Sequence, residues 1–136
     1  MSRVRNKDTR LEQKVRSALH RRGLRFRKHL HEVPGRPDVA FTRARVLVFI
    51  DGDFWHGYGF RRWKENLAPS WQRKISENRA RDRRNSRRLR QDGWKVVRLW
   101  QHEVERDLNL CVERVVEAVA KARAAEDGRL FSSYLS

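Results

Sequence analysis

Two apolar runs with acidic ends decide the fold: PGRPDVAF at residues 34–41 and VLVFIDGDFWHG at residues 46–57. Their apolar centres predict two neighbouring strands. The second is apolar throughout, as expected for a strand buried on both faces. Asp38 begins the first strand, and Asp51 and His56 follow the second. Carboxylates gathered at the ends of adjacent strands provide the oxygen ligands that Mg²⁺ prefers, so this stretch predicts a Mg²⁺ pocket.

The composition is that of a small and highly charged chain. Of 136 residues, 38% are hydrophobic and 37% are charged, a balance that also occurs in disordered proteins. The five tryptophans and six phenylalanines argue for a folded chain, because they fall in strand and helix patterns that can close a core. We therefore expect a single domain over residues 1–136 with one modest core.

The charge balance points to a polyanionic partner. Thirty-three Lys and Arg residues against 17 Asp and Glu residues give a formal charge of +16, far more than solubility requires. A ribosomal or chromatin-type protein fits this charge equally well. The charge therefore predicts binding and leaves the chemistry open.

Cysteine usage and the apolar runs indicate a soluble, intracellular protein. Cys111 is the only cysteine, which excludes a disulfide or a cysteine-based zinc site within the chain. The first residues do not resemble a signal peptide, and no run approaches the roughly 20 apolar residues of a membrane span.

The remaining pattern predicts helices and strands around the central pair. Helices are expected from Asp8 to Gly23, from Ser70 to about Gln91, near 101–106 and over 108–125, with strands at 24–30 and 94–100. Residues 57–69 are predicted to be irregular. Gly128 is predicted to end the last helix. The order predicts an α/β fold, a small mixed sheet flanked by helices.

Each candidate site residue has an ordinary explanation beside the functional one. Asp38 alone is a common turn residue, and Asp51 with Gly52 could simply end a strand. However, ionised groups against a buried strand are costly unless they are paired or bind a metal. His56 follows directly and could act as a general base or orient a metal-bound water. Glu12 could form a capping box with Thr9 or support the pocket from behind.

Aromatic and basic residues suggest how DNA would be held. Phe54 and Trp55 lie in a glycine-rich, basic stretch, where exposed aromatics suit insertion into DNA. On the long helix, Asn78 and Asp82 fall on the inward stripe, and Lys74 precedes Asn78 by one turn. The other faces carry arginines that we expect to contact phosphates rather than only water: Arg73, Arg79, Arg81, Arg83, Arg84, Arg87, Arg88 and Arg90.

A series of short motifs has the order and spacing of a known family. They are NKDT (6–9), LE (11–12), GLRF (23–26), PGRPD (34–38), VFIDG (48–52), FWHG (54–57), KI (74–75) with Asn78, RD (81–82), and LRQDGWKV (89–96) with Trp100. From about residue 1 to 100 the chain resembles the very-short-patch-repair (Vsr) endonucleases, a branch of the restriction-endonuclease-like PD-(D/E)xK superfamily.

The resemblance implies a Mg²⁺-dependent endonuclease that nicks one DNA strand at a thymine–guanine (T:G) mismatch. It implies that Asp38 binds the metal together with the backbone carbonyl of Ile50, and that Asp51 lines the metal pocket. His56 would assist activation of the attacking water. Glu12 and Asp82 would support these residues from behind.

The resemblance also implies the DNA contacts. Met1, Phe54 and Trp55 match residues that wedge into the base stack, and Lys74 and Asn78 match residues that read the mispaired bases. The predicted DNA-binding set is completed by four arginines of the long helix: Arg79, Arg81, Arg83 and Arg84.

One family feature is expected to be missing. Vsr endonucleases commonly hold a structural zinc with cysteines and a histidine, and this chain has Asp53, Tyr58, Phe60 and His102 at those positions. We expect no structural zinc, and a hydrogen bond between Asp53 and His102 in its place.

The expected partner is double-stranded DNA, with mismatch-repair proteins as further partners. We expect a monomer in the bacterial cytoplasm, associated with the nucleoid and not with a membrane. Two other functions remain open: a Vsr-fold nuclease of different specificity, such as restriction or phage defence, and a non-catalytic DNA-binding module. A small basic RNA-binding protein fits less well, because it would not explain carboxylates clustered at strand ends.

Overall fold

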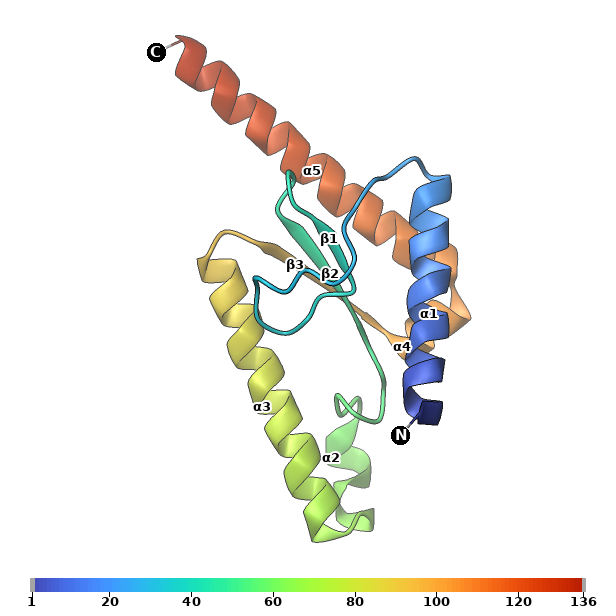
Figure 1. Ribbon diagram of the computed structural model, residues 1–136. Coiled ribbons are helices and arrows are strands. Elements are labelled where there is room, and N and C mark those ends of the chain that lie inside the picture. The colour runs from blue at the N-terminus through green and yellow to red at the C-terminus, as the bar shows by residue number, and fades with distance from the viewer. Residues whose placement is uncertain (1, 136) are drawn as a thin grey trace.

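The computed structural model describes the backbone of residues 2–135 and the side chains of residues 10–128. A three-stranded sheet lies between helices, which confirms the predicted α/β class (Figure 1). The elements in chain order are α1 (Ser2–Arg21), β1 (Val39–Phe41), β2 (Val46–Asp51), α2 (Phe60–Trp63), the 3-10 helix η1 (Lys64–Asn66), α3 (Pro69–Gln91), β3 (Lys95–Trp100), α4 (Gln101–Arg106) and α5 (Leu108–Leu135).

The sheet is mixed, with β2 at its centre. β1 pairs antiparallel with β2, placing Val39 opposite Val48, and β3 pairs parallel with β2, placing Asp51 opposite Trp100. Val46 to Phe49 are all buried, as expected for a central strand covered on both faces. The polar end of β2 therefore emerges at the edge where β3 also ends.

Two apolar clusters cover the two faces of the sheet. The larger cluster joins α1, α4 and α5 to one face, with Leu19, Leu99 and Val115 fully buried. The smaller cluster packs Leu89 of α3 against Leu47 on the other face. Figure 1 accordingly shows α1 and α5 on one side of the sheet and α3 on the other. Among the described residues, no helix has both the length and the apolar character needed to span a membrane.

The strand predicted at 24–30 is wrong. Arg27 makes only an isolated antiparallel bridge with Ala40, through two backbone hydrogen bonds of 2.9 Å. Leu24 and Phe26 still pack on the larger cluster, which explains the alternating pattern. His29 has a φ of 54°, a left-handed conformation that breaks an extended strand.

The predicted start of the first helix is also wrong. The helix α1 begins at Ser2 rather than near Asp8, so Thr9 lies within it and cannot be the N-cap of a capping box with Glu12. The predicted end is confirmed. Gly23 has a φ of 79°, and its amide and that of Leu24 bond back to His20 and Leu19, closing the helix as a Schellman motif.

Three smaller boundaries differ from the prediction. The helix α3 follows Ala68 and begins with Pro69, so Ser70 lies inside it, as the preference of proline for the first helical position explains. The stretch 57–69, expected to be irregular, contains α2 and η1. The helix α5 runs past Gly128, which lacks the positive φ seen at Gly23, so this glycine weakens the helix without ending it.

Candidate active site

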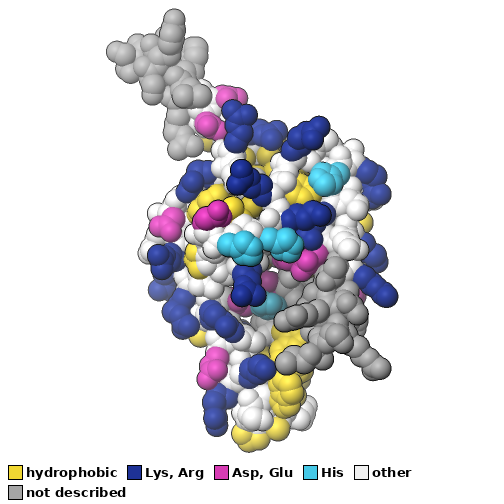
Figure 2. Space-filling view, in the orientation of Figure 1, with side chains coloured by type: hydrophobic (Ala, Val, Ile, Leu, Met, Phe, Trp, Pro, Cys, Tyr) yellow, Lys and Arg dark blue, Asp and Glu magenta, His cyan; other side chains and the backbone are white. Residues whose placement is uncertain are grey.

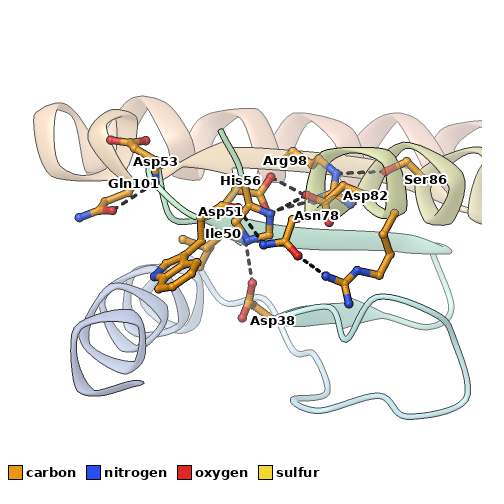
Figure 3. Close-up of polar contacts among 12 residues, drawn as sticks. Asp38, Ile50, Asp51, Asp53, His56, Asn78, Asp82, Ser86, Arg98 and Gln101 are labelled. Carbon is orange, nitrogen blue, oxygen red and sulfur yellow. Dashed lines mark hydrogen bonds and ion pairs between the residues drawn. The ribbon is translucent and has the colours of Figure 1, made fainter. Parts of the chain in front are cut away.

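Residues from four parts of the chain meet at the polar end of β2. Asp38 comes from the start of β1, Asp51 ends β2, His56 lies in the following loop, and Asp82 projects from α3 (Figure 3). Together with Glu12 of α1 they line a cavity of about 430 Å³. The site therefore has room beside Asp38 for an ion and a phosphate group.

Asp38 is held firmly in this cavity. Its Oδ2 accepts a hydrogen bond of 2.6 Å from the amide of Ile50, across the β1–β2 pair. Its backbone oxygen accepts two bonds from Arg16, at 3.1 Å from Nε and 2.8 Å from Nη2. Pro37 and the positive φ values of Gly35 and Arg36 shape the turn before it. Backbone and side-chain contacts thus fix both the position and the direction of the carboxyl group.

A second carboxylate lies against Asp38. Burial, together with the hydrogen bond and the negative charge of Glu12, raises the pKa of Asp38 to about 8, against the opposing effects of the Ile50 amide and of Arg16. Arg16 also lies 3.6 Å from Glu12. Two half-buried acidic groups in contact are stabilised by a shared proton or by a bound cation.

The raised pKa of Asp38 makes a prediction about stability. Because this pKa is 3.8 ordinarily and about 8 in the folded protein, ionisation of Asp38 favours unfolding between about pH 4 and pH 8. Asp38→Asn should therefore stabilise the metal-free protein at pH 7 by roughly 2–4 kcal/mol, and the gain should vanish below about pH 4. Thermal unfolding across this pH range measures it.

A matched variant and a cation complete this test. Asp92→Asn removes the same charge at an exposed position after α3 and should leave stability nearly unchanged. A divalent cation should raise the melting temperature of the wild type and not that of Asp38→Asn. A less stable Asp38→Asn variant at pH 7 would contradict the electrostatic account of this site.

His56 is bracketed by two carboxylates. Its Nδ1 lies 2.6 Å from Oδ2 of Asp82 and 3.8 Å from Oδ1 of Asp51. Burial acts to lower the pKa of His56, but the hydrogen bond to Asp82 and the charges of Asp51 and Asp82 outweigh it and raise this pKa above its usual value. With Nδ1 bonded to Asp82, the neutral ring keeps Nε2 as its proton acceptor.

Arg98 is a part of the site that the sequence pattern did not reveal. Asp51 is only 4% exposed, and its two oxygens lie 2.9 and 3.0 Å from Nη1 of Arg98. The Nε of Arg98 donates to Oγ of buried Ser86, at 3.1 Å. Arg98 lies within the strand predicted at 94–100, and its only signal in the sequence is that it is a charged residue between the apolar Val97 and Leu99.

Aromatic side chains gather beside the cavity. Phe54 is 42% exposed and stacks on Trp63, with ring centroids 5.6 Å apart, and it packs edge-on against Trp55. Trp71 at the start of α3 contacts both Phe54 and Trp55. Lys74 lies over the ring of Trp55 at 5.3 Å. Phe54, Trp55, Trp63 and Trp71 thus form a partly exposed aromatic cluster with a cation beside it.

The structure brings together most of the predicted residues. Lys74 and Asn78 line the same cavity as Asp38, and Asn78 donates to the backbone oxygen of Trp55 at 3.2 Å. Arg81 bonds to Asn78 at the surface, and Arg84 is exposed on α3. Two further arginines, Arg79 and Arg83, line a second cavity. Met1 lies outside the described residues.

Three of the positions that the resemblance compares with the zinc ligands of the family, Asp53, Tyr58 and His102, are in contact with one another. Nδ1 of His102 lies 2.9 Å from Oδ1 of Asp53, as predicted. Tyr58 packs on His102, with ring centroids 4.2 Å apart, and Phe60 is buried. These contacts join the loop that carries His56 to the start of α4.

The donor set around Asp38 suits a hard divalent cation. Within residues 10–128, no three His, Cys, Asp or Glu side chains gather as a ready-made metal cage. Mg²⁺ does not require one, because it binds through one or two carboxylates and fills its remaining positions with water and substrate phosphate oxygens. The paired carboxyls of Asp38 and Glu12 beside an open cavity meet that requirement.

Comparisons with known proteins agree with this geometry. A family model described as DNA mismatch endonuclease Vsr matches residues 1–62. The type II nicking enzyme V.XorIIP of Xanthomonas oryzae is 44% identical over 106 residues, which cover 76% of this chain and 78% of the relative. The type II nicking enzyme V.NmeDIP of Neisseria meningitidis is 36% identical over 117 residues, covering 84% and 79%.

The DNA mismatch endonuclease Vsr of Escherichia coli is also similar. It is 35% identical over 103 residues, covering 74% of this chain and 66% of the relative. The family match includes Asp38, Asp51 and His56, three of the residues that line the cavity. On the combined strength of these matches, the chain belongs to the Vsr family of DNA endonucleases.

Proposed function

We propose that this protein nicks one strand of double-stranded DNA at a T:G mismatch, with Mg²⁺ as its cofactor. As a member of the Vsr family it is a DNA endonuclease, and nucleases of this family require a divalent metal. The observation that carries the proposal is the single cavity shared by Asp38, Asp51, His56 and Asp82 inside a strongly basic protein. An association with mismatch-repair proteins and a monomeric state stay predictions.

Asp38 and the backbone carbonyl of Ile50 would hold the Mg²⁺ ion. When bound, the ion supplies charge stabilisation at the scissile phosphate and lowers the pKa of a coordinated water. Glu12 supports Asp38 through their hydrogen bond. Asp51 remains a candidate further ligand, although both of its oxygens contact Arg98 in this structure.

His56 would accept the proton of the attacking water. Asp82 holds Nδ1 of His56, which leaves Nε2 free to take that proton as the water oxygen bonds to phosphorus and the P–O bond to the leaving strand breaks. Asp82 then stabilises the protonated ring. Arg98 offsets part of the charge of Asp51, so Asp51 and Asp82 together raise the pKa of His56 less than two unpaired carboxylates would.

The aromatic cluster would recognise the mismatch. A T:G pair stacks less stably than a matched pair, so inserting Phe54 and Trp55 costs less there. Lys74 and Asn78 lie between the cluster and the catalytic residues, where they could contact the mispaired bases.

The double variant Phe54→Ala/Trp55→Ala should lose mismatch preference. We expect the ratio of T:G to matched-duplex affinity to fall about ten-fold or more, because each stacked base contributes ~1–3 kcal/mol, whereas phosphate contacts keep nonspecific binding in place. Competition binding in EDTA measures the ratio. Leu110→Ala, at a 60% exposed position on α5, is the control. An unchanged affinity ratio would show that Phe54 and Trp55 do not take part in mismatch recognition.

One assay tests the proposed function as a whole. Linear duplexes that differ only in having a T:G or a T:A pair at one position are incubated with the protein, with and without Mg²⁺. We expect a single nick in the T:G duplex with Mg²⁺ and none in EDTA. Equal nicking of both duplexes would indicate a nuclease of another specificity. Tight binding without any cleavage would indicate a non-catalytic DNA-binding module.

A further inference from the structure

A second and larger cavity lies behind the catalytic residues. It measures about 910 Å³ and runs between α3, the loop at 57–59 and β3. Four residues, Asp51, His56, Asp82 and Arg98, line both cavities and form the wall between them. In Figure 3 Asp38 lies on one side of these residues and Ser86 on the other. We call the second cavity the arginine groove.

The groove carries a row of arginines along α3. Arg79, Arg83 and Arg87 recur every fourth residue and so lie on one face of the helix, and Arg90 follows one turn later. None of these four takes part in the ion pairs found among residues 10–128. The stem of Arg79 packs against Gly57, where a Cβ atom would come within 2.6 Å of Cδ. The groove therefore presents four guanidinium groups without an ion-pair partner among the described residues, since the two carboxylates in its wall, Asp82 and Asp51, pair with His56 and Arg98.

Aromatic surface lies beside these charges. Tyr58 is 50% exposed, and its ring centroid is 5.1 Å from that of Trp100 on β3. Both residues line the groove. A basic groove with aromatic side chains is how proteins bind single-stranded nucleic acid, because guanidinium groups follow the backbone while unpaired bases stack. In an intact duplex the bases are stacked on each other and cannot use Tyr58.

We propose that the arginine groove binds a single-stranded segment of DNA, namely the strand that comes free beside the nick. This assignment rests on the proposed function, since the nick supplies the strand end and the wall that contains His56 separates groove and reaction centre. The cleaved strand ends in a phosphate monoester, whose extra negative charge suits unpaired arginines. The enzyme would thereby retain its nicked product.

The test measures binding of a short fluorescent single-stranded thymidine oligonucleotide in EDTA, so that no cleavage occurs. Arg87→Ala/Arg90→Ala should weaken binding roughly ten-fold at moderate salt and reduce the slope of log K against log salt by about 1.4, since each lost phosphate contact removes about 0.7. Arg43→Ala/Arg106→Ala removes the same charge at exposed positions outside α3 and outside the groove, and it should change affinity by about two-fold at most.

Tyr58 provides an independent arm. Tyr58→Ala should weaken binding about five-fold or more without changing the salt slope, and Tyr58→Phe, which keeps the ring, should bind as the wild type does. Equal losses of affinity for the single strand in the two double arginine variants, or full affinity in Tyr58→Ala, would overturn the assignment. So would a wild-type protein that does not prefer a duplex with a single-stranded tail over the same duplex with blunt ends.

This outcome is separable from that of the proposed function. The binding assay requires neither a mismatch nor Mg²⁺, so a protein that cuts nothing can still show groove-dependent binding. Conversely, the wild type could nick T:G duplexes while Arg87→Ala/Arg90→Ala still binds single strands normally. That result would overturn only the assignment of the arginine groove and leave the proposed function in place.

Discussion

Asp38→Asn should reduce the rate of T:G nicking at least about a thousand-fold while changing DNA affinity only a few-fold. A loss of this size corresponds to about 4 kcal/mol in the activation free energy, as expected when the residue that anchors the metal is removed. Asparagine keeps the shape and can still accept the hydrogen bond from the Ile50 amide. The change therefore removes charge with little disturbance of the fold.

Single-turnover nicking and duplex binding separate the two effects. The protein is saturated with T:G duplex, Mg²⁺ is added, and the first-order rate is compared with that of Asp92→Asn, which should cut like the wild type. The affinity is measured in EDTA by fluorescence anisotropy. If Asp38→Asn cuts within ten-fold of the wild-type rate, Asp38 does not hold the metal and the catalytic assignment fails. A large loss of affinity would instead indicate a role in DNA binding.

The sheet was predictable because its signals are local. Residues 46–50 form an unbroken apolar run, and the acidic residues at its end have no place in a core, so both the strand and the polar edge follow from sequence. The strand predicted at 24–30 was wrong because Leu24 and Phe26 pack on the core with an alternating spacing, whereas the backbone pairs only at Arg27. An alternating apolar pattern indicates which side chains are buried. Whether the segment forms a strand depends on backbone pairing with a neighbouring strand, which the local sequence does not specify.

The candidate site likewise has a part that could be predicted from the sequence and a part that depends on the fold. Asp38, Asp51 and His56 stand next to strand ends, where a polar residue is conspicuous. The pairing of Asp51 with Arg98, by contrast, depends on the parallel register of β2 and β3, across 47 residues of chain. The arginine groove is likewise a product of packing. The sequence shows a basic helix, and only the fold turns one face of that helix toward Tyr58 and Trp100.

His56→Ala should reduce the nicking rate by about a hundred- to ten-thousand-fold, the usual contribution of a positioned general base. Asp82→Asn should cause a smaller loss and should also move the pH profile. Asp82 raises the pKa of His56, and the base form of a histidine exists only above its pKa. The wild-type rate should therefore rise with pH through a midpoint above the usual histidine value, and Asp82→Asn should shift that midpoint to lower pH.

The direction of this shift distinguishes a base from a structural histidine. If His56 acted as a general acid, its protonated form would be the active one, and the rate would fall through the same midpoint as pH rises. If His56 only held the loop, Asp82→Asn would lower the rate at every pH without moving the profile. His20→Ala, which alters an exposed histidine stacked on Phe26 and distant in sequence from the site, controls for histidine loss. Because the hydrogen bond to Asp82 is the largest of the effects that raise the pKa of His56, replacing Asp82 should move the pH profile by a measurable amount.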